Sequence, residues 1–102
     1  MKPDAIYTQQ LTSIRTLCKR YGVRTLSTFG SVGTERFRAE SDVDLLVFFK
    51  EMSPVDYADA YFELAQALEE LLNRAVDLVT EASLSNPYFT ASVARSKRKL
   101  YR

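Results

Sequence analysis

The stretch FGSVGTERFRAESDVDLLVFF, residues 29–49, decides how this chain folds. It ends in VDLLVFF, a short apolar run bounded by polar residues, which is typical of a strand covered on both faces. Asp42 and Asp44 stand at the entrance of this strand, two residues apart, so their side chains point the same way with Cα atoms roughly 6.5 Å apart. Carboxylates in this position are costly unless a cation meets them. The stretch therefore predicts a central strand with a cation site at its start.

A divalent metal is the cation that this pattern favours. Two carboxylates this close repel each other, and a divalent ion between them keeps both ionised. Oxygen ligands on a rigid strand suit Mg²⁺. Asp77, a lone carboxylate within the apolar run 74–80, would add a third ligand if the two strands are neighbours. Three carboxylates around two ions about 4 Å apart form the usual arrangement for in-line phosphoryl or nucleotidyl transfer.

The alternative is that Asp42 and Asp44 are a solvated strand end, because D-x-D is common by chance. That interpretation explains neither the acid at position 77 nor Gly30 and Ser31, which directly follow an earlier strand-like run. A glycine followed by a serine lets backbone N–H groups and a hydroxyl approach a phosphate closely. The combination predicts a triphosphate at one strand end and a metal pair at the next.

The rest of the chain supplies the elements around these motifs. A strand, a long helix and a second strand form a crossover that places two parallel strands close together in one sheet. The fold class is therefore α/β (α+β), with a mixed sheet of three or four strands and helices packed against it. The expected elements are a helix over 4–21 stopped by Gly22, a strand over 23–29, a loop over 30–41, a strand over 43–49, a helix from Ser53 to Asn73, a strand over 74–80, and a short helix starting at Asn86 and Pro87.

Length and composition exclude several classes of protein. At 102 residues the chain is a single domain, and its formal net charge of +1 gives no bulk signal for nucleic acid. The chain contains one cysteine and no histidine, which excludes disulfide frameworks, zinc sites and histidine-dependent triads. Cys18 lies on the apolar stripe of the first helix and is interpreted as a core residue. With no signal-peptide or membrane-spanning segment, a cytoplasmic location is expected.

Taken together, these motifs resemble the minimal nucleotidyltransferases of the DNA polymerase β superfamily. Their signature is a GS turn, an intervening stretch, a DxD motif and a later single acid. The resemblance covers nearly the whole chain, 1–102, and implies one palm-like domain. The matching residues here are Gly30, Ser31, Ser41, Asp42, Val43, Asp44, Leu45, Leu46, Val47 and Asp77.

The resemblance also implies roles. Asp42, Asp44 and Asp77 are the expected catalytic and metal-binding residues, with two Mg²⁺ ions that Mn²⁺ can replace and ATP as the substrate. Thr34 stands where members often have an arginine, and Arg36 or Arg38 is expected to supply that positive charge. The full set of expected nucleotide-binding residues is Gly30, Ser31, Thr34, Arg36, Arg38 and Ser41.

The acceptor is not identified by the residues themselves. The resemblance implies an antitoxin that adds AMP to a tyrosine of a HEPN-domain toxin. The alternatives are transfer to a small molecule such as an aminoglycoside, and a non-catalytic antitoxin or binding module that keeps the fold. The basic end ARSKRKLYR, residues 94–102, is interpreted as a solvated helix face and tail rather than a contact for an acidic partner or RNA. Four tyrosines are interpreted as core or rim packing residues rather than a stacking platform: Tyr7, Tyr57, Tyr61 and Tyr88.

Overall fold

The computed structural model describes residues 5–29 and 43–102. Within these residues, one four-stranded sheet has the strand order β3-β2-β1-β4. The elements are α1 (Ala5–Arg20), β1 (Val23–Thr28), β2 (Val43–Phe49), α2 (Pro54–Leu72), β3 (Val76–Thr80), the 3₁₀ helix η1 (Glu81–Ser85), α3 (Pro87–Ser96) and β4 (Arg98–Tyr101). This is the small α+β domain that the sequence predicts.

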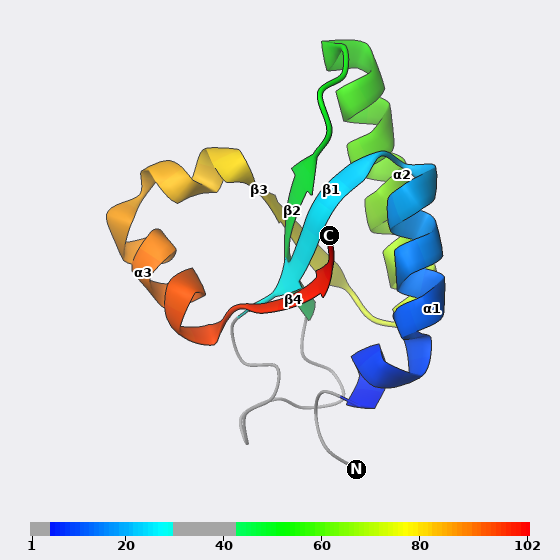
Figure 1. Cartoon of the computed structure of the whole chain (residues 1–102), viewed down its shortest axis with the longest axis horizontal. Coiled ribbons are helices and arrows are strands. Elements are labelled where there is room, and N and C mark those ends of the chain that lie inside the picture. Colours follow the sequence, from blue (N-terminus) through cyan, green and yellow to red (C-terminus); the bar gives the residue numbers. More distant parts are fainter. Residues whose placement is uncertain (1–4, 30–42) are drawn as a thin grey trace.

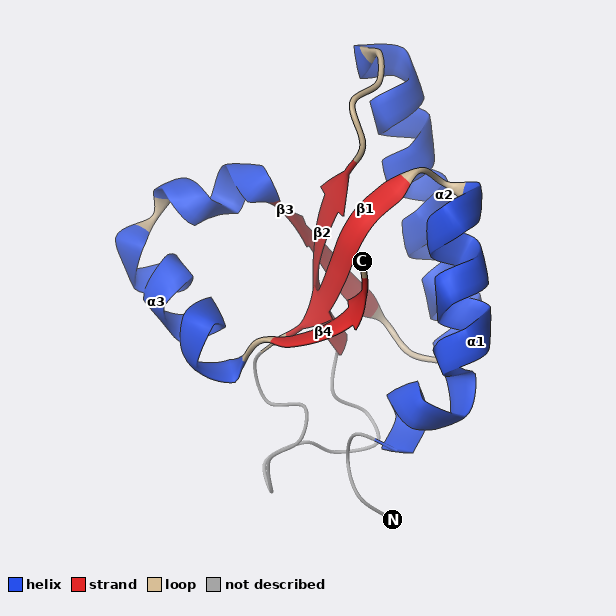
Figure 2. Cartoon of the chain, viewed as in Figure 1, coloured by secondary structure: helices blue, strands red, loops and turns tan. Residues whose placement is uncertain are grey.

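Helices cover both faces of the sheet (Figures 1 and 2). Helices α1 and α2 lie on one face, and η1 and α3 lie on the other. The larger apolar cluster lies between the sheet and α1 and α2, and includes Ile14, Leu45 and Leu64. The smaller cluster, around Leu46 and Val93, lies under α3. The sheet is therefore the middle of three layers.

Strand β2 is the centre of this arrangement. Its residues alternate between the two apolar clusters: Val43, Leu45 and Val47 belong to the larger one, whereas Leu46 and Phe48 belong to the smaller. This alternation follows from the period of two in a strand, which sends successive side chains to opposite faces. The prediction of a central strand covered on both faces is confirmed.

The pairing of the strands makes the sheet mixed. Strand β1 runs antiparallel to both β2 and β4, and β2 runs parallel to β3. Helix α2 makes the crossover that a parallel pair requires. The predicted strand-helix-strand unit is confirmed.

Local signals set both ends of α2. The Ser53 side chain accepts a hydrogen bond from the Asp56 backbone N–H at 3.2 Å, and Pro54 opens the helix. Asn73 ends it with φ 55° and ψ 42°, a left-handed conformation that suits asparagine. Both boundaries agree with the predicted helix. The predicted stop of α1 is also confirmed, because Gly22, two residues after the last residue of that helix, has φ 72°.

The C-terminal segment differs from the interpretation as a helix face and tail. Residues 98–101 form β4, which pairs with β1 and has a register shift beside Leu100. The run RKLY has no apolar alternation that would signal a strand, so its conformation depends on the backbone groups that β1 offers. The structure also contains η1, which the sequence did not predict, and β3 begins at Val76, two residues later than expected.

Of the four tyrosines interpreted as packing residues, the side chain of Tyr7 lies outside the described part of the structure, and the other three divide into two groups. Tyr57 and Tyr61 are half-buried and pack as predicted. The prediction for Tyr88 is wrong, because this residue is 87% exposed at the start of α3. The predicted loop over 30–41 lies outside the described residues. No helix within the described ranges is long and apolar enough to cross a membrane.

Candidate active site

Two of the three predicted acids face each other across neighbouring strands. In the parallel ladder of β2 and β3, Asp44 is the register partner of Asp77. Neighbouring strands lie about 4.8 Å apart, and residues paired in register point to the same face of a sheet. Asp44 is half-buried and Asp77 is exposed. The fold therefore brings together two carboxylates that are distant in the chain.

The acid pair lies on the face of the sheet that η1 and α3 cover. Leu46 follows Asp44 by two residues, Val79 follows Asp77 by two, and both belong to the apolar cluster under α3. Because side chains alternate along a strand, the acids share the face of these two residues. Both acids lie at the starts of their strands, the end of the sheet at which β1 finishes.

Phe29 connects this end of the sheet to α3. Its backbone N–H donates to the Asp44 carbonyl oxygen at 3.2 Å, which extends the β1–β2 ladder by one residue beyond Thr28. Its ring meets the ring of Phe89 edge to face, with centroids 5.4 Å apart. Phe89 belongs to the first turn of α3, where the Asn86 side chain caps the backbone N–H groups. Helix α3 is thus fixed beside the strand position that carries Asp44.

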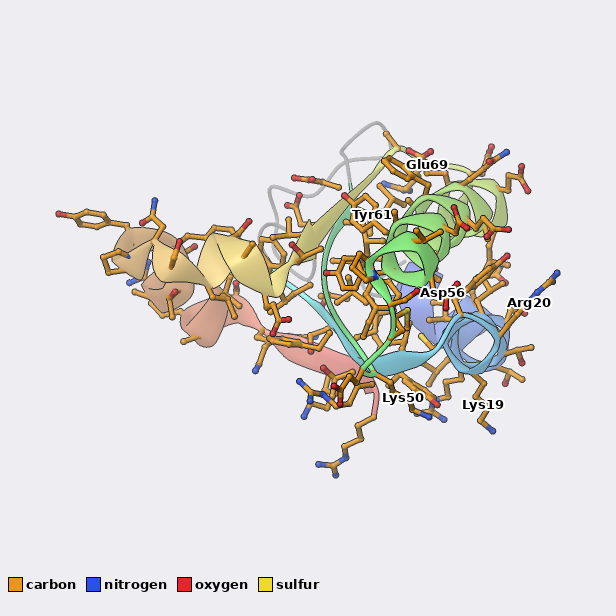
Figure 3. All side chains as sticks on the ribbon, turned by 90° about the horizontal axis from the view of Figure 1, so that it is seen from above. Lys19, Arg20, Lys50, Asp56, Tyr61 and Glu69 are labelled. Atoms are coloured by element: carbon orange, nitrogen blue, oxygen red, sulfur yellow. The ribbon has the colours of Figure 1, made fainter. Side chains whose placement is uncertain are left out.

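Two side chains of α2 hold β3 on either side of Asp77. The Glu69 carboxylate accepts a hydrogen bond from the Val76 N–H at 3.0 Å, and the Tyr61 hydroxyl donates to the Leu78 carbonyl at 2.6 Å. Figure 3 shows both residues on the side of α2 that meets β3. They are positioning residues that sequence reasoning missed. The only available signal was their helical period, which did not indicate contact with a strand.

The remaining predicted site residues cannot be placed. Seven of them lie outside the described residues: Gly30, Ser31, Thr34, Arg36, Arg38, Ser41 and Asp42. Asp42 is joined directly to Val43, the first residue of β2. In the part of the chain that the structure describes, no group of three or more acids, histidines or cysteines is placed to hold a metal ion. The donors that are present, two carboxylates on adjacent strands, fit a hard divalent cation that would need further ligands.

Cys18 plays no part in this site. It is fully buried in the larger cluster, and burial raises the pKa of its thiol from 9.0 to about 12. A thiol that stays protonated at neutral pH is a poor nucleophile. The interpretation of Cys18 as a core residue is confirmed.

Comparison with known proteins identifies this fold. A family model described as the nucleotidyltransferase domain matches residues 12–100. The chain belongs to this family. A solved structure of a minimal nucleotidyltransferase superposes with a TM-score of 0.70 at 34% identity, covering 96% of this chain and 95% of the other. The predicted fold class and family are confirmed.

Two further relatives describe what similar nucleotidyltransferases do. The protein adenylyltransferase MntA of Thermococcus cleftensis is 40% identical over 70 residues, which are 69% of this chain and 68% of MntA. A crystal structure of a toxin-antitoxin with AMP-PNP matches with a TM-score of 0.66 at 25% identity, over 88% of this chain and 71% of the other. The chain is an enzyme of the nucleotidyltransferase class, whose members use a nucleoside triphosphate and a divalent metal.

Proposed function

We propose that this nucleotidyltransferase transfers AMP from ATP to a tyrosine hydroxyl of a partner protein, a HEPN-type toxin, and so acts as its antitoxin. The observation that carries the proposal is the register pairing of Asp44 with Asp77. A chance D-x-D motif has no reason to face a third acid on the next strand. The similarity to a protein adenylyltransferase and to a toxin-antitoxin structure with AMP-PNP, an ATP analogue, supports the choice of nucleotide and of acceptor.

Asp42, Asp44 and Asp77 are the residues that would hold two divalent ions, Mg²⁺ or Mn²⁺. When bound, such ions neutralise charge that develops on the transferred phosphoryl group. Gly30, Ser31 and Ser41 would bind phosphate oxygens through N–H and hydroxyl groups, with Arg36 or Arg38 giving positive charge beside Thr34.

In the reaction, the tyrosine oxygen bonds to the α-phosphorus of ATP and the bond from that phosphorus to the bridging oxygen breaks. Pyrophosphate leaves, and the hydroxyl proton passes to Asp77 or to water. Asp77 suits this role because it is exposed on β3, a strand at the edge of the described sheet, where an acceptor carried by another protein can reach it. Such chemistry needs positioning and charge neutralisation, which a chain without histidine can provide.

The test is intact-mass spectrometry of the protein encoded beside this chain's own gene, after incubation with ATP and Mg²⁺. We expect an adenylyl increment on a tyrosine, which EDTA abolishes. Asp44→Asn and Asp77→Asn should each slow transfer by about 100-fold or more, the scale of losing one electrostatic group at a reacting centre. Glu51→Gln is the matched control, because Glu51 is an exposed acid beyond the opposite end of β2.

The outcomes separate the enzyme from the alternatives. Equal transfer by the two Asn variants and by the control would place the chemistry elsewhere. If no nucleoside triphosphate gives an increment, yet the Asp44→Asn and Asp77→Asn variants still bind and inhibit the neighbouring protein, this chain acts by contact alone. Transfer to an aminoglycoside but not to protein would identify a small-molecule enzyme.

A further inference from the structure

Helix α2 has a charge pattern that folding explains only in part, because Asp56 lies in the favourable first turn and Glu69 bonds to β3 whereas the other acids have no such role. The helix contains five acids and no basic residue, and all five acids are exposed. Asp59 and Glu63, one turn apart on the same side, repel each other and weaken the helix. The five acids are Asp56, Asp59, Glu63, Glu69 and Glu70.

Large apolar side chains lie beside these acids. Val55 is 71% exposed and Phe62 is 69% exposed, and they are two turns apart with the exposed Ala58 between them. The ring of Phe62 meets that of Tyr61 edge to face at 5.3 Å between centroids. Residues spaced by three and seven share one side of a helix. We call Val55, Ala58, Asp59, Phe62 and Glu63 the α2 ridge, an apolar stripe next to an acidic one.

One end of the α2 ridge reaches β3, the edge strand that carries Asp77. Tyr61, the neighbour of Phe62, donates to the Leu78 carbonyl, and Glu69, lower on α2, accepts from the Val76 N–H. Leu78 and Val76 are the residues on either side of Asp77 in β3. A protein lying along the ridge would therefore meet the β3 edge, and its hydroxyl would reach round this edge to Asp77 on the opposite face.

We propose that the α2 ridge is the docking surface for the acceptor protein, which would offer an apolar groove with lysine and arginine side chains on its rim. The proposal rests on the proposed function, because it takes the acceptor to be a protein. Exposed aliphatic and aromatic side chains bind through apolar burial, and the acidic stripe selects a cationic partner and fixes its register.

A second copy of this chain is the competing occupant. A basic hollow of about 650 Å³ lies between α1 and β4. Its lining residues are Arg15, Lys19, Lys99, Leu100, Tyr101 and Arg102. Figure 3 shows Lys19 near the end of α1, on the side of that helix away from α2. This basic hollow lies at the β4 edge, on the opposite side of the described sheet from β3. In the described sheet, β1 and β2 separate this hollow from the strand of Asp77, whereas the ridge adjoins that strand, so the acceptor is favoured over self-association.

The experiment compares two double charge reversals in steady-state transfer to the neighbouring-gene protein. Asp59→Lys with Glu63→Lys changes the ridge, and Arg15→Glu with Lys19→Glu changes the basic hollow by the same number of charges. We expect the ridge variant to raise KM for the acceptor about tenfold or more, with kcat and KM for ATP unchanged. Phe62→Ala should raise the acceptor KM in the same way. The basic-hollow variant should stay within about twofold of the wild type.

The other outcomes distinguish failure of the docking surface from failure of the proposed function. An acceptor KM that no ridge change raises overturns the docking surface and leaves the transfer reaction standing. If the wild type transfers nothing, the proposed function fails, and calorimetry with the same protein decides the docking. If the wild type binds the acceptor protein and the ridge variants do not, the docking surface is supported. If the ridge variants bind equally well, or if the wild type does not bind, the docking surface is overturned. Self-association in sedimentation that either reversal abolishes assigns the ridge to a second copy and also overturns the proposal.

Discussion

Replacing Tyr61 by phenylalanine tests how α2 holds the strand of Asp77. The change removes only the hydroxyl, which donates to the Leu78 carbonyl at 2.6 Å. Leu78 is 4% exposed, so water has little access to replace the lost donor. A hydrogen bond of this kind contributes about 1 kcal/mol net, and a buried acceptor left unsatisfied costs up to about 3 kcal/mol. We expect the free energy of unfolding to fall by about 1.5 kcal/mol, which lowers Tm by about 6 to 12 °C in a domain of this size.

The assay is urea unfolding followed by far-ultraviolet circular dichroism, in which the midpoint should fall with an unchanged m-value. Tyr57→Phe is the matched control. Tyr57 lies one turn earlier on α2, its ring meets Phe49 at 5.0 Å between centroids, and its hydroxyl bonds to none of the described residues. The control should change stability by less than about 0.5 kcal/mol. Equal midpoints for the two variants would refute the reasoning that the hydroxyl stabilises the β3 edge.

Two further predictions concern stability. Burial raises the pKa of Cys18 from 9.0 to about 12, so the buried thiol favours folding below pH 9, and this contribution is lost as pH rises through about 12. Unfolding measured across this window should show a steeper alkaline loss of stability for the wild type than for Cys18→Ala, and parallel curves would contradict the assignment. Asn73 has φ 55°, so Asn73→Ala should lower the free energy of unfolding by about 1 kcal/mol, whereas Asn73→Gly should keep or raise it. Thermal melts of the pair check this, and equal losses would show that the left-handed cap does not matter.

Elements with local signals could be predicted from the sequence. Helix α2 begins after a serine whose side chain caps it and ends at an asparagine that tolerates a left-handed conformation, and both residues act without help from distant parts of the chain. Strand β2 was predictable because its apolar run needs cover on both faces, which only a central strand receives. Strand β4 was not, because it exists through pairing with β1.

The same distinction between local and non-local signals applies to the candidate site. The spacing of Asp42 and Asp44, together with the lone acid Asp77, was the basis for predicting a metal site. Their pairing in register depends on the length of α2 and on the apolar cluster that it closes, which no local pattern encodes. The hydrogen bonds of Tyr61 and Glu69 to β3 have the same non-local origin. The α2 ridge was overlooked because the exposed Val55 and Phe62 interrupt an otherwise polar face that sequence patterns assign to solvent.

The unequal layers of the sheet have a consequence for motion. The cluster against α1 and α2 has thirteen fully or nearly buried residues, and the cluster under α3 has three, Phe29, Leu46 and Val93. Segments with few buried apolar contacts open at a fraction of the free energy of global unfolding. The layer of η1 and α3 is thus the unit that can detach while the crossover of β2, α2 and β3 stays folded. Asp44 is half-buried on the face under that layer, so local opening of η1 and α3 would widen access to this acid and leave its register with the exposed Asp77 intact.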